Sequence, residues 1–375
     1  MITLERLHLR EIRMPLRTPF ETSAGVQHHR RILLMEAIDR DGTVGWGECV
    51  APEYPNYTEE TIDTAWIALE QWLSPLVLRT SFASAAEVFD VLEKAVRGHR
   101  MAKAALEMTL WELEARKQGC SLATLLGGTR QEIAVGISLG IQPDAGRLRE
   151  RIEEALERGY QRIKLKIKPG KDLEVVAQAH ELIAGRVPLS VDANNAYTIE
   201  ALPLFQKLDT YNLLMIEQPL EWQDLVRHAY LQKHLQTPVC LDESLTGPAR
   251  VEDMLQLGSG RIVNIKPGRV GGFTPSLRMH AICQAHHIPV WCGGMLESGI
   301  GRAHNVALAS LPGFSLPGDI SESARYWQED IVSPSWRMHR PGYLRVPVEH
   351  PGMGVEVDRE RVQKLTVRER ILEAK

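Results

Sequence analysis

Short apolar runs recur along the middle of the chain at a spacing of about 25 residues, and stretches with helical periodicity separate them. Runs rich in Val, Ile and Leu are typical of strands that are buried on both faces. Between the runs, apolar residues recur every three or four positions, as in helices with one buried face. The eight runs are IAVGISLG (133–140), QRIKLKI (161–167), VPLSVDA (187–193), NLLMIEQ (212–218), TPVCLDE (237–243), GRIVNIK (260–266), IPVWCGG (288–294) and FSLPGDI (314–320).

The alternation of strand and helix predicts consecutive βα units with right-handed crossovers. Eight strands within about 200 residues fit a closed parallel barrel, so the fold class is α/β with a TIM-type barrel. The competing architecture is an open, doubly wound sheet. That fold usually carries a glycine-rich phosphate loop after its first strand. Neither GxGxxG nor GxxxxGK[ST] occurs in the sequence, which favours the barrel.

The ends of the chain lack this repeat and predict a second, α+β domain. Residues 31–49 predict two antiparallel strands joined at an Asp41-Gly42 turn. Helical patterns follow, and Gly119 is placed to end the last of them. The tail predicts short strands and turns that return to the first domain. The helical patterns cover 58–77, 85–97 and 100–118, and the predicted divisions are 1–125 for the capping domain, 126–325 for the barrel and 326–375 for the tail.

Composition excludes several classes of protein. The 375 residues include 44 Lys+Arg and 48 Asp+Glu, a net charge of −4, which argues against a nucleic-acid partner. No apolar window is long enough for a membrane span, and the first residues lack a signal-peptide core. The five cysteines are scattered, without CxxC spacing, and suit a reducing compartment. We therefore expect a cytoplasmic protein without membrane partners.

Charged residues end most of the predicted barrel strands, and catalytic groups of parallel barrels gather where strands end. A buried strand that ends in a charge is costly unless that charge is paired or binds a metal. Five successive endings in the order Lys, Asp, Glu, Asp, Lys therefore predict a site. The final residues of the eight units are Ser138, Lys166, Asp192, Glu217, Asp242, Lys266, Cys292 and Asp319.

Three carboxylates on neighbouring strands would repel one another without a cation between them. Asp192, Glu217 and Asp242 offer only oxygen ligands, which favours Mg²⁺, or Mn²⁺ or another divalent ion in its place, over zinc. Lys166 and Lys266 are expected to face each other across the ion, with pKa values lowered so that they act as bases. The ion would stabilise an enediolate, and the outcome would be racemisation or elimination.

Each of these residues also has a simpler interpretation when it is taken alone. The alternating lysines 164, 166 and 168 are typical of a solvated strand face. Asp192 could cap the next helix, and Asp242 with Glu243 could form an acidic first turn. Their joint occurrence at matching strand ends is what favours a functional site.

At these residues the chain resembles the enolase superfamily, in its muconate-cycloisomerase-like subgroup. The branch it resembles contains o-succinylbenzoate synthases and N-succinylamino acid (N-acylamino acid) racemases, and the likeness covers nearly the whole chain. The motifs are RIKLKIKPG (162–170), VDANNAY (191–197), IEQPL (216–220), CLDES (240–244), NIKPGRVGG (264–272) and WCGGMLESGIGRAHN (291–305).

The resemblance implies a modified (β/α)7β barrel under a capping domain built from the N-terminal region and the tail. It implies that Asp192, Glu217 and Asp242 bind the metal and that Lys166 and Lys266 are the acid–base pair. The accessory and substrate-binding residues that it implies are Lys164, Asn194, Glu243, Ser138, Gly293, Met295 and Phe20. Phe20 belongs to a segment, residues 16–26, that is expected to close over the barrel mouth.

Two departures from other branches narrow the expected chemistry. Mandelate-racemase-like members use a His on strand 7, where this chain has Cys292. Dipeptide epimerases carry Asp-x-Asp at the eighth strand, where this chain has Asp319-Ile320-Ser321, so an N-acylated or amine-free substrate fits better.

The resemblance implies Mg²⁺-dependent syn dehydration of 2-succinyl-6-hydroxy-2,4-cyclohexadiene-1-carboxylate to 2-succinylbenzoate in menaquinone biosynthesis. The alternative is racemisation of N-succinylamino acids at the same site. A muconate-type cycloisomerase ranks lower, and a non-catalytic metal-binding barrel ranks last. The expected partner is a small carboxylate substrate, and the family resemblance also implies a homo-oligomer. Met295, Tyr326 and Trp327 are left open between pocket lining and core, and the histidines are expected to be structural or exposed.

Overall fold

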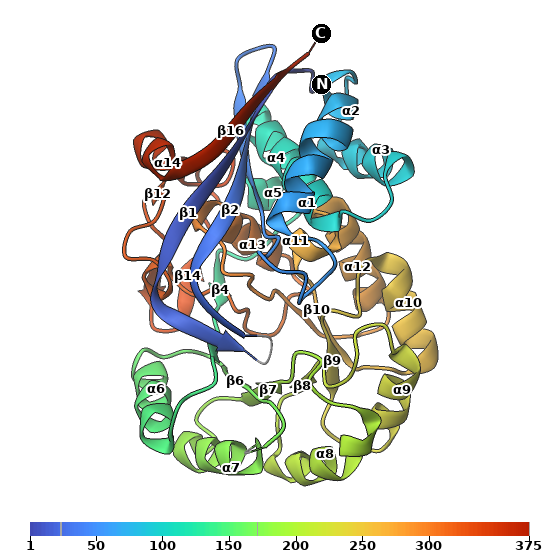
Figure 1. Cartoon of the computed structure of the whole chain (residues 1–375), viewed down its shortest axis with the longest axis vertical. Coiled ribbons are helices and arrows are strands. Elements are labelled where there is room, and N and C mark those ends of the chain that lie inside the picture. Colours follow the sequence, from blue (N-terminus) through green and yellow to red (C-terminus); the bar gives the residue numbers. More distant parts are fainter. Residues whose placement is uncertain (23–24, 171, 375) are drawn as a thin grey trace.

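The computed structural model describes residues 1–22, 25–170 and 172–374. Long antiparallel strands and a group of helices form one end of the molecule, and a ring of βα units forms the other (Figure 1). Both ends of the chain lie in the antiparallel part, where the last strand pairs with the first (Figure 1).

The barrel sheet contains seven parallel strands in sequential order, which confirms the predicted succession of βα units. The strands are β5 (Ile137–Leu139), β6 (Ile163–Lys166), β7 (Leu189–Asp192), β8 (Ile216–Glu217), β9 (Val239–Leu241), β10 (Ile262–Asn264) and β11 (Val290–Trp291). The helices around them are α6 (Ala145–Glu157), α7 (Asp172–Ile183), α8 (Leu202–Leu208), α9 (Leu225–Lys233), α10 (Pro248–Leu257), α11 (Pro267–Val270), α12 (Phe273–Ala285) and α13 (Gly299–Ala309).

The last of the predicted strands, 314–320, is not a regular strand, because Pro317 has no N–H to donate to a ladder. Its backbone still bridges the two edges of the sheet. Asp319 N donates to Cys292 O at 3.0 Å on one side, and Gly136 N donates to Gly318 O at 2.7 Å on the other. The barrel thus closes through individual hydrogen bonds. The first predicted strand also divides, because β4 (Glu132–Ala134) joins a different sheet from β5.

The capping sheet has the strand order β16-β1-β2-β3 and is antiparallel throughout. Its strands are β1 (Leu4–Thr22), β2 (Gly25–Asp39), β3 (Val44–Cys49) and β16 (Thr366–Glu373). The predicted turn between β2 and β3 is confirmed by a hydrogen bond from Gly42 N to Asp39 O at 2.9 Å. The pairing of β16 with β1 confirms that the tail returns to the N-terminal region.

Helices pack on one face of this sheet. The central one, α4 (Arg100–Gln118), is buried along most of its length and lies against β3 and α11. As predicted, it ends at Gly119, which has a φ of 66°. The other helices of this region are α1 (Ile62–Ile67), which continues through a π-helical stretch (Ala68–Leu73) into α2 (Ser74–Leu78), then α3 (Val88–Ala95), α5 (Leu122–Leu125) and, in the tail, α14 (Arg359–Leu365).

The tail contacts both parts of the molecule. Strands β13 (Met338–Arg340) and β14 (Tyr343–Arg345) form a sheet with β4, and β12 (Val332–Ser333) pairs with β15 (Glu356–Val357). The predicted boundaries 1–125, 126–325 and 326–375 stay predictions. No helix within the described residues has the length and apolar character needed to span a bilayer.

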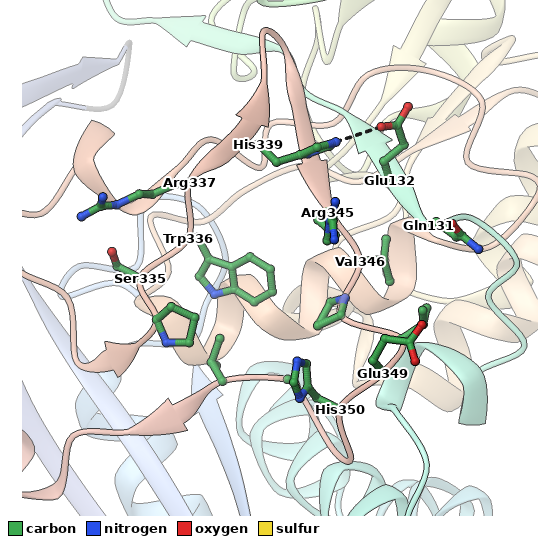
Figure 2. A pocket seen from close by; sticks show the side chains of 15 residues that line it. Gln131, Glu132, Ser335, Trp336, Arg337, His339, Arg345, Val346, Glu349 and His350 are labelled. Atoms are coloured by element: carbon green, nitrogen blue, oxygen red, sulfur yellow. Dashed lines mark hydrogen bonds and ion pairs between the residues drawn. The ribbon is translucent and has the colours of Figure 1, made fainter.

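A pocket of about 650 Å³ lies beside β14 and the following tail segment (Figure 2). Its charged side chains do not converge on one point. Arg337 extends away from the indole of Trp336, and His339 pairs with Glu132. The charged side chains of this pocket are therefore not arranged to act on one substrate atom.

Glu112 is a testable anchor between α4, β3 and the tail. Its fully buried carboxylate accepts hydrogen bonds from Trp46 N at 3.0 Å, Met353 N at 3.4 Å and Arg116 Nε at 2.5 Å. Glu112→Ala leaves these donors unpaired and should lower the free energy of unfolding by about 3–5 kcal/mol. The measurement is chemical denaturation followed by tryptophan fluorescence.

Glu153→Ala on the exposed face of α6 is the matched control. Its partner Arg149 lies 3.7 Å away and is itself exposed, so the expected change is below about 0.5 kcal/mol. Equal denaturation midpoints for the two variants would contradict the anchoring role of Glu112.

Candidate active site

The charged strand ends lie side by side at one edge of the barrel sheet. Lys166, Asp192 and Glu217 are the last residues of β6, β7 and β8. Lys166 is the register partner of Asp192, and Asp192 is the register partner of Glu217. Asp242 directly follows β9, and Lys266 lies two residues beyond β10. The structure thus brings these residues to the same end of adjacent strands.

Each of the three carboxylates is buried and paired with a cationic side chain. Asp192, Glu217 and Asp242 are at most 1% exposed. Lys166 Nζ donates to Asp192 Oδ2 at 2.6 Å, and Lys266 Nζ donates to Asp242 Oδ2 at 2.7 Å. Lys164 Nζ donates to Glu217 Oε2 at 2.7 Å, and this ammonium also lies 3.2 Å from Asp192 Oδ2. The acidic row is therefore neutralised by a row of amines.

Burial and the charges of neighbouring groups shift the pKa values of these carboxyl groups. Burial, together with Asp192 and other nearby carboxylates, raises the pKa of Glu217 to about 7. Burial and the neighbouring Asp242 likewise raise the pKa of Glu243 to about 8. Burial opposes ionisation of Asp242 as well, but Lys266 and Arg269 outweigh it and lower its pKa. Four acids thus share one electrostatic environment.

The lysine pKa values differ from the sequence-based expectation. Burial lowers the pKa of Lys266, but Asp242, Tyr57 and further acids outweigh burial and hold it well above its usual range. The same balance, with Asp319 and Glu217 as the main acids, raises the pKa of Lys164. The carboxylates around Lys266 thus favour its charged form, and the lowering of its pKa by a bound divalent ion stays a prediction.

Asn194 and Glu243 extend this network. Asn194 Oδ1 accepts from Lys166 Nζ at 2.6 Å, and Asn194 Nδ2 donates to Glu243 Oε1 at 3.1 Å. Asn195 Nδ2 donates to the same Glu243 oxygen at 3.2 Å. The other oxygen, Oε2, is buried and has no hydrogen-bond partner among the described residues.

Ser138 and Gly293 flank the charged row. Ser138 lies on β5 opposite Lys164, and its buried hydroxyl has no partner among the described residues. Gly293 N donates to Asn264 Oδ1 at 2.9 Å. A Cβ at position 293 would lie 2.5 Å from Lys266 Cε, so a larger residue there would displace this lysine. Met295 is half-buried against the core, which leaves its role open.

The segment around Phe20 is the end of the β1–β2 hairpin and reaches loops that follow barrel strands. Ile141 N donates to Glu21 O at 3.2 Å, and Lys168 Nζ donates to Glu21 Oε1 at 3.3 Å. Phe20 meets Tyr326 edge-on with a centroid distance of 6.4 Å. Closure of 16–26 over the mouth stays a prediction, and residues 23–24 lie outside the described part of the chain. Tyr326 is half-buried, whereas Trp327 belongs to the core.

Several residues that the sequence did not single out complete the site. Asp319, noted as a strand end and in the comparison with dipeptide epimerases, lies 2.7 Å from Lys164 Nζ and also pairs with Arg162. Arg269 pairs with Asp242. Tyr57, from the capping domain, donates its hydroxyl proton to Asp242 Oδ1 at 3.1 Å and lies 3.1 Å from Lys266 Nζ. Asn264 Nδ2 donates to Glu217 Oε1 at 2.9 Å. A signal in the sequence existed for Asp319, a predicted strand end, and for Arg269 and Asn264, which both fall within the motif NIKPGRVGG (264–272), but none existed for Tyr57.

The residues present suit a hard divalent cation. In the part of the chain that the structure describes, no group of three or more His, Cys, Asp or Glu is arranged as a ready metal site, since lysines and Arg269 hold the carboxylate oxygens. The donors are nevertheless all carboxylates, and the buried Glu243 Oε2 accepts no hydrogen bond from any residue that the structure describes. Oxygen donors without imidazole or thiolate are the ligands that Mg²⁺ prefers. A cavity of about 190 Å³ borders Lys166 and the loop 140–145.

Matches to protein-family models cover most of the chain. Residues 5–127 match the mandelate racemase / muconate lactonizing enzyme N-terminal domain, and residues 147–362 match the enolase C-terminal domain-like family. A structure of a dipeptide epimerase from Cytophaga hutchinsonii, complexed with Mg and a dipeptide, has the same fold, with a TM-score of 0.91 at 23% identity and full coverage of both chains.

Relatives of higher identity have two different names. The chain is 47% identical to an o-succinylbenzoate synthase of Bacillus subtilis, with 97% of each chain covered. It is 46% identical to an N-succinylamino acid racemase of an Amycolatopsis species, again with 97% of each chain covered. A crystal structure of an enolase superfamily member from Listeria innocua matches all of both chains, with a TM-score of 0.96 and 38% identity. The chain belongs to the enolase superfamily, with the N- and C-terminal domains of the mandelate racemase and muconate lactonizing enzyme type.

Proposed function

We propose that this chain is an o-succinylbenzoate synthase, which dehydrates 2-succinyl-6-hydroxy-2,4-cyclohexadiene-1-carboxylate to 2-succinylbenzoate in menaquinone biosynthesis. The observation that carries the proposal is the row of Lys166, Asp192, Glu217, Asp242 and Lys266 at matching ends of β6 to β10. The Bacillus subtilis relative, 47% identical over nearly the whole chain, supports the choice of substrate. The proposed partner is thus a small carboxylate, and we propose a cytoplasmic homo-oligomer.

Asp192, Glu217 and Asp242 would hold Mg²⁺. When bound, the ion would supply the positive charge that stabilises the substrate carboxylate as the adjacent carbon loses its proton. Lys164, buried beside Glu217 and Asp192, adds a fixed positive charge to the same region. Glu243 and Asn194 would hold the surrounding groups in place through their shared hydrogen bond of 3.1 Å.

Lys166 is the proposed base that removes the α-proton. Its Nζ is fixed by two acceptors at 2.6 Å, Asp192 Oδ2 and Asn194 Oδ1, so the amine is oriented before substrate arrives. Lys266 is the proposed cation on the other side of the substrate, where its charge supports the carbanionic intermediate. Tyr57 and Asp242 orient this second amine. The bond between the neighbouring carbon and its hydroxyl oxygen then breaks, and the leaving hydroxide takes up the proton held by Lys166 and departs as water.

Racemisation of N-succinylamino acids is the second candidate. The two amines are held on strands separated by β7, β8 and β9, each by its own carboxylate, so one can serve each side of an α-carbon. Ser321 stands where a second acid would hold a substrate ammonium, which favours acylated amines. The 46% identical Amycolatopsis racemase supports the candidate. A muconate-type cycloisomerase ranks lower, and a non-catalytic barrel ranks last because none of the proposed lysines and carboxylates is missing from the sequence.

Replacing Lys166 tests its role as the base. Lys166→Ala should lower kcat for dehydration by about 10²–10⁴-fold, the usual contribution of a positioned general base. Lys168→Ala is the matched control, because this lysine belongs to the same alternating run but is 51% exposed and pairs with Glu21. The control should keep its rate within about twofold. A Lys166→Ala enzyme as fast as the parent excludes the proposed mechanism.

Metal removal tests the proposed ligands. Chelation should abolish turnover, and Mg²⁺ or Mn²⁺ should restore it and raise the melting temperature. Asp242→Asn should remove the metal-induced rise in melting temperature, because one of three ligands is neutralised. Asp253→Asn, which changes an exposed acid of α10, should preserve that rise. Undiminished turnover in the chelated enzyme would contradict the metal dependence, and metal-induced stabilisation without any turnover would favour the binding barrel.

Hydrogen exchange tests the racemase candidate. In deuterated water the enzyme should exchange the α-hydrogen of both N-succinyl-L- and N-succinyl-D-phenylalanine, because one amine serves each face. Lys166→Ala and Lys266→Ala should each abolish exchange of a different enantiomer, followed by NMR. If both variants lose the same enantiomer, the two amines do not flank the α-carbon.

A further inference from the structure

The segment 266–274 joins the proposed second base to the start of a barrel helix, and it lies against the capping domain. It begins with Lys266, continues through α11 and enters α12 at Phe273. Its turn is closed by hydrogen bonds from Arg269 N to Lys266 O at 3.0 Å and from Gly272 N to Pro267 O at 2.9 Å. The position of Lys266 is therefore linked by a short, hydrogen-bonded turn to the first residues of α12.

A carboxylate of the capping domain binds that first turn of α12. Glu107, on α4, is completely buried, and its Oε2 accepts from Phe273 N at 2.7 Å. Its Oε1 accepts from Thr274 N at 2.8 Å and from Trp111 Nε1 at 2.8 Å. A helix N-terminus offers unpaired N–H groups and a favourable dipole to such an acid. Here the acid that caps the helix comes from the other domain.

Glycines allow the segment to approach the capping domain closely. A Cβ on Gly272, whose φ is +118°, would lie 2.1 Å from Glu107 Oε2. Cβ atoms on Gly268 and Gly271 would lie 2.6 Å from Val50 and 2.7 Å from Phe89. The run PGRVGG therefore fits closely against α3, α4 and the residue that follows β3, all in the capping domain. This contact leaves the segment little room to shift.

The opposite end of the segment is held by the site itself. Arg269 pairs with Asp242 and donates from Nη2 to Asn264 O at 2.7 Å. Lys266 lies 3.1 Å from the hydroxyl of Tyr57, which also belongs to the capping domain. The capping domain thus contacts both ends of the segment through polar groups, Tyr57 at Lys266 and Glu107 at Phe273. Of these two, Glu107 is the one that does not contact the proposed reacting groups.

We propose that Glu107 is a positioning residue for Lys266. It acts across the domain interface by fixing the start of α12 and hence the turn that carries this amine. The inference rests on the proposed function, because it assigns separate faces of the substrate to Lys266 and Lys166. Lys166 lies on β6 and is held by Asp192 and Asn194, whereas Glu107 accepts from Phe273, Thr274 and Trp111.

Because each amine is assigned to one face of the substrate, the ratio of the exchange rates of the two enantiomers tests the proposal. General destabilisation of the enzyme would lower both rates and leave this ratio unchanged. In deuterated water, the enantiomer whose exchange is lost in Lys266→Ala identifies the face that Lys266 serves. Glu107→Gln puts an amide N–H against one of the helix N–H groups and should displace the turn. We expect exchange of the Lys266 enantiomer to fall by roughly 10- to 100-fold, the cost of a misplacement of about 1 Å. Exchange of the Lys166 enantiomer should stay within about twofold of the parent.

Glu60→Gln is the matched control. Glu60 is also a buried acid at a helix N-terminus, accepting from Met101 N at 2.7 Å and Ala102 N at 3.1 Å, but that helix is α4 of its own domain. Its replacement should leave the ratio of the two exchange rates unchanged. Trp111→Phe removes one donor to Glu107 while keeping an aromatic ring, and should shift the ratio in the same direction by a smaller factor.

Each outcome decides between the two claims. If the parent enzyme neither dehydrates its substrate nor exchanges either enantiomer, the proposed function fails and the inference fails with it. If the parent exchanges both and Glu107→Gln slows both equally, the proposed function stands and the inference is overturned. If Glu107→Gln does not fold, the ratio measured for Trp111→Phe decides, and an unchanged ratio overturns the inference.

Discussion

Acids buried side by side at the ends of parallel strands need positive charge nearby, and this requirement organises the barrel mouth. Asp192 and Glu217 are register partners with almost no exposure to water. A buried charge that lacks a partner costs several kcal/mol, so every cation at the site has an electrostatic reason for its place. Lys166 and Lys266 each pair with one acid, and Lys164 pairs with three, namely Asp192, Glu217 and Asp319. The same groups are those needed to remove a proton next to a carboxylate.

The capping domain is part of this arrangement and not only a cover. Glu48 of β3 accepts from Ser298 N at 3.0 Å and from Gly301 N at 2.9 Å, so it caps α13 as Glu107 caps α12. Burial raises the pKa of both acids to about 7, and the helix N–H groups lower the cost of their ionisation. Helices that follow β10 and β11 are therefore anchored by acids from another domain. The interface between the two domains therefore contains buried hydrogen bonds from helix N–H groups to carboxylates.

The succession of strands and charged ends was predictable because buried parallel strands have a continuous apolar pattern and end at the same side of the sheet. The return of the tail to the first domain was also expected, but no residue pattern indicated that β16 would pair with β1. The irregular closure at 314–320 was missed, although Pro317 indicates that a regular ladder is interrupted there. Tyr57 left no recognisable pattern, since it lies in an irregular segment far from the barrel motifs. Its role arises only where the capping domain meets Lys266.

By itself, the sequence determined which strands carry acids and amines and in what order, because the order of βα units is written directly along the chain. Only the tertiary structure decided which amine lies against which acid and which groups arrive from the other domain. Asp319 and Lys164 are 155 positions apart in the numbering, yet their charged atoms lie 2.7 Å apart. Such distances depend on how the barrel closes and how the domains pack, and local patterns of residues do not encode either.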